Sequence, residues 1–136
     1  MNFSEWLLLE KKHDPCAGIF FTDGKSVLLL KRSEGSSNPR TWALPGGHAK
    51  EGESPQKNAE RECKEEIGCV KGKKVGQLVQ DGWWTCFFYK VNKPFDVKMS
   101  KEHTNWAWIK FDELNDYDLH PEFKKQLKKY INFAKR

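Results

Sequence analysis

Three glutamates near the middle of the chain, Glu62, Glu65 and Glu66, have the side chains and the spacing of a metal site. If this segment is helical, residues three and four apart lie on one face, with Cβ atoms ~5–6 Å apart. Three like charges in one patch destabilise an isolated helix, and a divalent cation would offset them. Carboxylate oxygens suit Mg²⁺ or Mn²⁺. The alternative is a solvated acidic face that neighbouring basic residues screen.

The residues around these glutamates predict the helix that would position them. Ser54 is a good N-cap residue, and Pro55 fits the first helical position. Gly68 can close the helix in a left-handed conformation. The apolar residues recur four apart and would form the buried stripe: Ala59, Cys63 and Ile67.

Glycines flank the predicted helix and favour the metal site over the solvated face. Gly46 and Gly47 precede the helix, and Gly68 follows it. Glycine at such positions indicates backbone that needs positive φ or a close approach. We therefore expect the glycines to determine where the carboxylates point, and we expect Gly46 and Gly47 to contact a substrate.

Taken together, the segment 47–69 resembles the Nudix box. That pattern runs Gly, five residues, Glu, seven residues, Arg-Glu, an aliphatic residue, one residue, Glu-Glu, one residue, Gly and an aliphatic residue. All seven fixed positions are present: Gly47, Glu53, Arg61, Glu62, Glu65, Glu66 and Gly68. Such a match would arise by chance at on the order of a few in a billion starting points. Cys63 and Cys69 stand at the aliphatic positions, where a small buried hydrophobe alters packing but not chemistry.

The resemblance implies an α/β fold: an α/β/α sandwich with a mixed sheet, as one domain over residues 1–136. The box would form a loop, a helix and a loop at the edge of the sheet. The resemblance also implies hydrolysis of a nucleoside diphosphate linked to another moiety. Glu62, Glu65 and Glu66 match the metal-binding and base positions, and Glu53 and Arg61 match an orienting pair. A carboxylate near a helix N-terminus favours the helix dipole and can hold a guanidinium.

In the implied mechanism, Mg²⁺ or Mn²⁺ neutralises the diphosphate oxygens, lowers the pKa of a bound water and stabilises the leaving phosphate. A carboxylate that the metal does not fully use takes the proton of the water. Glu62 and Glu66 both remain candidates for this base. Glu102 resembles a distant acidic residue that some family members add to the metal site; the alternative is an exposed loop charge.

Substrate contacts outside the box are expected from basic and aromatic side chains. Lys31 and Arg32 end a predicted strand and could hold a phosphate, or they could be simply solvated. Aromatic faces can stack on any base, although core packing is the alternative for each ring. The candidates are Trp42, Trp83, Trp84 and Phe87. His48 could contact the substrate or fill the turn.

The remaining elements follow from turn signals and periodicity. Residues 16–21 and 27–30 form a hairpin around Asp23-Gly24-Lys25. Residues 33–41 form a loop. Residues 42–44 form a short extended piece that ends at residues 45–47. Strands are expected near 74–80, 83–91 and 105–109. A second helix begins near Pro121, and its apolar face contains Phe123, Leu127, Tyr130, Ile131 and Ala134.

Length and composition set further limits. A chain of 136 residues suits one domain. No apolar run approaches the ~20 residues of a membrane span, and signal-peptide features are absent. We therefore expect a cytoplasmic protein with no membrane partner. The four cysteines form no CxxC pair, so reduced thiols are expected rather than a zinc site. Residues 71–136 hold 14 Lys/Arg against 8 Asp/Glu, which fits a phosphate-bearing ligand.

The favoured function is a MutT-like (deoxy)nucleoside triphosphate pyrophosphohydrolase that acts on a small nucleotide as a monomer or homodimer. One alternative is hydrolysis of ADP-ribose or another nucleotide sugar. Another is pyrophosphate or cap removal from RNA 5′ ends, which the lysine-rich last helix supports only weakly. A non-catalytic binding module with the same fold is a remote alternative, because every box glutamate is present.

Overall fold

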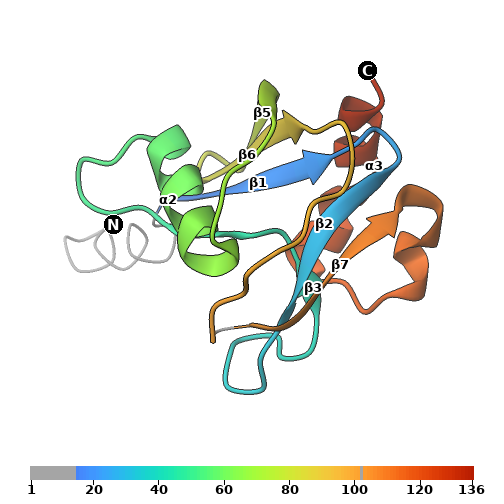
Figure 1. Ribbon diagram of the computed structural model, residues 1–136. Helices are drawn as coiled ribbons and strands as arrows, with labels where there is room; N and C mark the ends of the chain where they lie inside the picture. The colour runs from blue at the N-terminus through green and yellow to red at the C-terminus, as the bar shows by residue number, and fades with distance from the viewer. Residues whose placement is uncertain (1–14, 102) are drawn as a thin grey trace.

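The computed structural model describes residues 15–101 and 103–136. A mixed sheet lies between two helices, α2 (Pro55–Ile67) and α3 (Pro121–Ala134) (Figure 1). The other elements are β1 (Cys16–Thr22), β2 (Ser26–Arg32), β3 (Trp42–Ala43), β4 (Gly46–His48), β5 (Lys73–Gln80), β6 (Trp84–Lys90), β7 (His103–Lys110) and the 3₁₀ helix η1 (Phe111–Asp116). This architecture confirms the predicted α/β class.

The sheet is mixed because its central pair, β1 and β6, is parallel whereas the other pairs are antiparallel. β5 pairs with the far side of β6, and β7 pairs with β2 along its length. The predicted hairpin of β1 and β2 is present, but the two strands stay paired only at Thr22 and Val27. Beyond that point β3 pairs with β2, and β4 pairs with β1.

Each face of the sheet carries its own hydrophobic core. On one face, Cys63 and Ile67 of α2 pack with Phe87 of β6. On the other, Phe88 of β6 packs with Tyr130 of α3. Neighbouring residues of β6 thus face opposite cores, as the alternation of a strand requires. Because β1 and β6 are covered on both faces, they read as almost continuous apolar runs in the sequence.

The caps of α2 confirm the predicted helix boundaries. The Ser54 hydroxyl accepts a hydrogen bond from the Lys57 backbone N–H at 3.3 Å, and Pro55 occupies the first turn. Gly68 has φ of 83°, and its N–H donates to the Lys64 carbonyl. Only glycine adopts this left-handed conformation without a steric cost.

Three local features differ from the sequence-based expectation. Gly46–His48, expected only as the end of an extended piece, is the strand β4. The 3₁₀ helix η1 was not predicted. Trp83 lies in a turn, and β6 begins one residue later at Trp84. In the described part of the chain, no helix has the length and apolar character needed to cross a membrane.

Candidate active site

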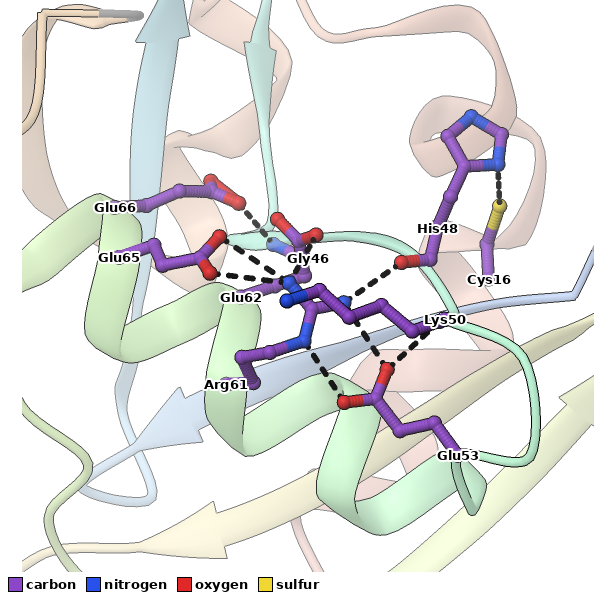
Figure 2. Close-up of polar contacts among 9 residues, drawn as sticks. All are labelled: Cys16, Gly46, His48, Lys50, Glu53, Arg61, Glu62, Glu65 and Glu66. Atoms are coloured by element: carbon purple, nitrogen blue, oxygen red, sulfur yellow. Dashed lines mark hydrogen bonds and ion pairs between the residues drawn. The ribbon is translucent and has the colours of Figure 1, made fainter.

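Arg61 lies at the centre of the acidic cluster on α2 (Figure 2). Its Nε and Nη2 atoms donate to the two carboxylate oxygens of Glu53 at 2.8 and 3.0 Å. Its Nη1 atom donates to Glu62 at 3.0 Å and to Glu65 at 3.1 Å. Nη2 also donates to the His48 carbonyl at 2.9 Å, which ties α2 to β4. One guanidinium therefore holds three carboxylates and the strand that precedes the helix.

Glu53 lies in the loop before α2 and is the most firmly held of these carboxylates. It accepts both guanidinium bonds of Arg61, and the Lys50 backbone N–H donates to it at 3.0 Å. These hydrogen bonds, chiefly those from Arg61, lower the pKa of Glu53 to about 2. The same pair raises the pKa of Arg61 above its usual value. Both groups are therefore ionised at neutral pH.

Gly46 and Gly47 place β4 directly against the carboxylates of α2. The Gly46 N–H donates to Glu66 Oε1 at 3.0 Å, and Glu66 is only 3% exposed. A Cβ on Gly47 would lie 2.6 Å from the Glu62 carboxyl carbon, and a Cβ on Gly46 would collide with the Ala17 carbonyl. Position 46 therefore needs glycine because of nearby backbone, whereas a side chain at position 47 would displace the Glu62 carboxylate; the predicted close approach is present at both positions.

The carboxylates of Glu62, Glu65 and Glu66 lie on the side of α2 that faces Gly46 (Figure 2). These three carboxylates do not converge on one position. Arg61 holds Glu62 and Glu65. The Glu66 carboxylate instead accepts from the Gly46 N–H and lies 3.6 Å from His103 Nε2. In residues 15–101 and 103–136, no three His, Cys, Asp or Glu side chains are gathered closely enough to hold a metal ion as they stand.

Two pockets adjoin the glycine pair. The first, hereafter the aromatic pocket, has a volume of about 390 Å³. It is lined by Cys16, Arg32, Ser37, Ala43, Leu44, Gly46, Gly47, His48, Gln80, Trp83, Trp84, His120, Glu122, Phe123 and Tyr130. The second, hereafter the Glu66 pocket, has a volume of about 370 Å³ and includes Glu66 and His103. The two pockets share Arg32, Leu44 and Gly46, so they lie side by side.

A family model and curated relatives identify this arrangement. The NUDIX domain model matches residues 12–131. The chain belongs to the NUDIX family. The asymmetrical bis(5′-nucleosyl)-tetraphosphatase of Caenorhabditis elegans is 30% identical, with 81% of this chain and 86% of that protein covered. An RNA pyrophosphohydrolase of Wolbachia pipientis is also 30% identical, with 85% and 73% covered.

Two further comparisons agree with this assignment. An 8-oxo-dGTP diphosphatase of Haemophilus influenzae is 27% identical, with 85% of this chain and 89% of that protein covered. The crystal structure of a MutT protein from Methanosarcina mazei superposes with a TM-score of 0.69 at 27% identity, and 90% and 98% of the two chains are covered. The chain is thus a MutT-like Nudix pyrophosphohydrolase. This assignment disfavours the alternative of a non-catalytic binding module with the same fold. Nudix hydrolases generally depend on a divalent metal.

The structure brings only some of the expected substrate contacts to the pockets of this Nudix fold. Arg32 lines both pockets and is held by Ser37, whose carbonyl and hydroxyl accept its hydrogen bonds at 2.8 and 3.0 Å. Its neighbour Lys31 lines neither of them. His48 lines the aromatic pocket, and its Nδ1 lies 3.1 Å from the Cys16 sulfur.

The four aromatic candidates divide into pocket and core residues. Trp83 and Trp84 both line the aromatic pocket, because Trp83 precedes the strand and does not follow its alternation. Phe87 is buried in the core beneath α2. Trp42 is 9% exposed and packs edge-on against Tyr117 at 5.4 Å. Its backbone N–H and carbonyl bond to Asp118 and His120, so Trp42 positions the segment before α3 rather than lining a pocket.

Several pocket residues have no counterpart in the sequence reasoning. Gln80, His120, Glu122 and Tyr130 line the aromatic pocket, but they belong to no local motif. The imidazole of His120 caps α3 by accepting from the Glu122 N–H at 3.2 Å. Burial, and then the nearby charge of Arg32, lower the pKa of His120 below its ordinary value.

His103 is a further residue that the sequence reasoning missed. It lies beside Glu66, in the pocket that the buried carboxylate lines. Its position next to Glu102 in the sequence was the only available signal. Glu102 itself lies outside the described residues.

Proposed function

We propose that this protein is a divalent-metal-dependent hydrolase of nucleoside triphosphates, with the nucleoside bound in the aromatic pocket. The observation that carries this proposal is the shared glycine pair. Gly46 and Gly47 line the aromatic pocket, and the same residues contact Glu66 and Glu62. A nucleoside in that pocket would therefore direct its phosphate chain across β4 toward the acidic face of α2.

The carboxylates of Glu62, Glu65 and Glu66 are the groups that would hold the metal. Their hard oxygen donors and one-sided arrangement fit Mg²⁺ or Mn²⁺. The guanidinium of Arg61 already supplies positive charge between Glu62 and Glu65. When bound, the metal would neutralise the diphosphate oxygens and lower the pKa of a water. Glu102, if it reaches the site, would add a fourth carboxylate.

Each residue around the metal has a distinct part in this proposal. Glu53 holds Arg61 through two bonds, so Arg61 stays in place if Glu65 turns toward a cation. The water must lose a proton to a nearby carboxylate, and Glu62 and Glu66 both remain candidates for this base. Arg32, between the two pockets, would bind a phosphate oxygen through its guanidinium.

A dinucleoside polyphosphate is a second candidate substrate. Such a ligand has a nucleoside at each end of its phosphate chain and needs two binding spaces. The Glu66 pocket adjoins the aromatic pocket through Arg32 and Gly46, and its volume is about 370 Å³. The C. elegans relative is a bis(5′-nucleosyl)-tetraphosphatase by name. This reading therefore ranks above hydrolysis of ADP-ribose or of RNA 5′ ends.

A substrate panel tests the proposal. Phosphate and pyrophosphate release should be measured with Mg²⁺ and with Mn²⁺ on nucleoside triphosphates, dinucleoside tetraphosphates, ADP-ribose and 5′-triphosphorylated RNA. We expect kcat/KM to be highest for a nucleoside triphosphate and to vanish in EDTA. A higher kcat/KM on ADP-ribose or RNA, or full activity in EDTA, would overturn the proposal.

A further inference from the structure

A chain of three hydrogen-bonded side chains lines part of the aromatic pocket. It connects β6 through α3 to the last residue of β5. The Trp84 indole Nε1 donates to the Tyr130 hydroxyl at 3.1 Å, and the Tyr130 hydroxyl donates to Gln80 Oε1 at 3.0 Å. Tyr130 and Gln80 are buried at 2% and 9% exposure. These groups therefore have little water around them, and their hydrogen-bond geometry is set by the protein.

The direction of these hydrogen bonds follows from the donor inventory. An indole N–H can only donate, so the Tyr130 oxygen must accept from Trp84. The single hydroxyl hydrogen of Tyr130 is then left for Gln80, whose Oε1 accepts it. This bond and the contact of the amide nitrogen with Glu122 together orient the Gln80 amide. Its Nε2 group must point away from Tyr130, and there it approaches Glu122 Oε2 at 3.4 Å.

The result is an amide donor beside a carboxylate acceptor at one side of the aromatic pocket. Both Gln80 and Glu122 line that pocket, together with Trp83. The 3.4 Å contact between them is long for a hydrogen bond, so a ligand that pairs better with both groups can displace it. Glu122 is exposed and in the first turn of α3, where a carboxylate is favoured by the helix dipole.

This pair suits the Watson–Crick edge of guanine. That edge has a carbonyl acceptor, O6, followed by two adjacent donors, N1–H and N2–H₂. O6 can accept from Gln80 Nε2, while the Glu122 carboxylate accepts from both N–H groups. The bidentate, charge-assisted pair is the strong kind. Adenine offers the carboxylate only its N6 amino group, and it has no donor at N1, so it forms one charge-assisted bond fewer.

We propose that Gln80 and Glu122 are the base-specificity residues, that they select guanine over adenine, and that Tyr130 is the positioning residue that keeps the Gln80 amide in its reading orientation. The proposal rests on the proposed function only in using the aromatic pocket as the nucleoside site. It goes beyond that function by naming the base.

Binding of mononucleotides separates this proposal from the hydrolysis itself. GMP and AMP should be titrated into the chain of 136 residues in EDTA, and binding measured by calorimetry. We expect GMP to bind at least tenfold more tightly than AMP, since one bidentate pair discriminates bases by roughly that factor or more. Equal affinities, tighter AMP binding, or no binding of either at millimolar concentration would overturn the proposal. A failed hydrolysis panel would leave the GMP result standing.

Two variants assign the effect to the named residues. Glu122→Gln should weaken GMP binding by roughly tenfold or more, because a hydrogen bond to a charged group is lost, and should change AMP binding less than twofold. Tyr130→Phe keeps the ring but frees the amide to turn, so the GMP-to-AMP affinity ratio should fall by about threefold or more. The matched control, Glu113→Gln on η1, removes an exposed charge away from both pockets and should change neither affinity.

A purely structural role for these residues gives a different result. Melting temperatures of all variants should be recorded beside the affinities. If Glu122→Gln and Tyr130→Phe weaken GMP and AMP by the same factor, the pair does not read the base. If Tyr130→Phe is too unstable to titrate, Gln80→Glu provides the same test, since it replaces the amide donor with an acceptor and should abolish the preference for GMP.

Discussion

Arg61 and the four nearby glutamates have different contacts and therefore different roles in this site. Glu53 binds Arg61 through both oxygens, whereas Glu62 and Glu65 share its remaining nitrogen. The Glu53 pair therefore supports the loop before α2, whereas Glu66 lines the second pocket. Glu66 is the buried member and bonds to the backbone of β4.

Neutralising the proposed metal ligands should remove most activity. Glu65→Gln and Glu66→Gln each delete a charge from the acidic face, and this loss should cost several kcal/mol of transition-state stabilisation. We expect kcat to fall on the order of a thousandfold. Steady-state kinetics with Mg²⁺ would measure this fall in kcat, and melting temperatures would show that the variants are folded. If both variants retain more than a tenth of the wild-type rate, the metal-site assignment is wrong.

The lowered pKa of Glu53 predicts a pH dependence of stability. Because its pKa falls from 4.5 to about 2 in the folded protein, ionised Glu53 contributes its full stabilisation above about pH 4.5. That contribution is lost as pH falls from 4.5 toward 2. Wild-type melting temperature should therefore drop more steeply over this interval than that of Glu53→Gln.

Thermal melts across that pH range check the Glu53 prediction. The control is Glu51→Gln, an exposed loop carboxylate, which should follow the wild-type curve. Parallel curves for wild type and Glu53→Gln would show that the ion pair with Arg61 adds nothing to stability.

At the scale of elements, the boundary between the 81–83 turn and β6 decides which aromatic rings can meet a substrate. Strict alternation from residue 83 would send Trp83 and Trp84 to opposite faces. The strand begins at Trp84, so both rings line the aromatic pocket. Phe87 follows the alternation and is 2% exposed in the α2-side core.

Truncation of these rings should separate binding from folding. Trp83→Ala should raise KM for the preferred nucleotide by roughly tenfold, because base stacking contributes ~1–3 kcal/mol, with little change in melting temperature. Phe87→Ala should destabilise the fold by ~3–5 kcal/mol as a buried aromatic. Kinetics and urea unfolding of the two variants measure both effects. Unchanged KM in folded Trp83→Ala would exclude this ring from base binding.

Over the whole molecule, the divergence of β1 and β2 creates the site. The two strands stay paired only near their turn, and β3 and β4 pair with their separated ends. β4 thereby lies between the acidic face of α2 and the aromatic pocket beside α3. The lysine-rich surface of α3 lies elsewhere: Lys124, Lys125, Lys128 and Lys129 are exposed and line neither pocket.

This separation predicts how the lysines affect two substrate classes. Changing all four to glutamine should leave kcat/KM for a small nucleotide within about twofold, because none contacts the pockets. If RNA were the true substrate, the same change should raise KM and flatten its salt dependence, since phosphate contacts act through counterion release. Measuring kcat and KM of the wild type and the variant on both substrates at several salt concentrations distinguishes these outcomes. A large effect on RNA cleavage, with RNA also the better substrate, would overturn the proposed function.

The sequence by itself determined the features that depend on neighbouring residues. Ser54, Pro55 and Gly68 bound α2 through local hydrogen bonds and backbone conformation, so its limits could be predicted closely. The spacing of Glu62, Glu65 and Glu66 placed them on one helix face for the same reason. Gly47 was expected to permit a close approach, although its partner, the Glu62 carboxyl, became evident only in the structure.

Only the tertiary structure decided the aromatic pocket. Gln80 contacts Glu122, which lies 42 positions away along the chain, and Tyr130, which lies 50 positions away. No local periodicity relates these residues. Trp42, in the short strand β3, and Trp83, just before β6, illustrate the same limit, because one is in the core and the other lines the pocket. Whether a side chain is buried or binds a ligand depends on which distant segments pack against it, and that packing is a property of the whole fold.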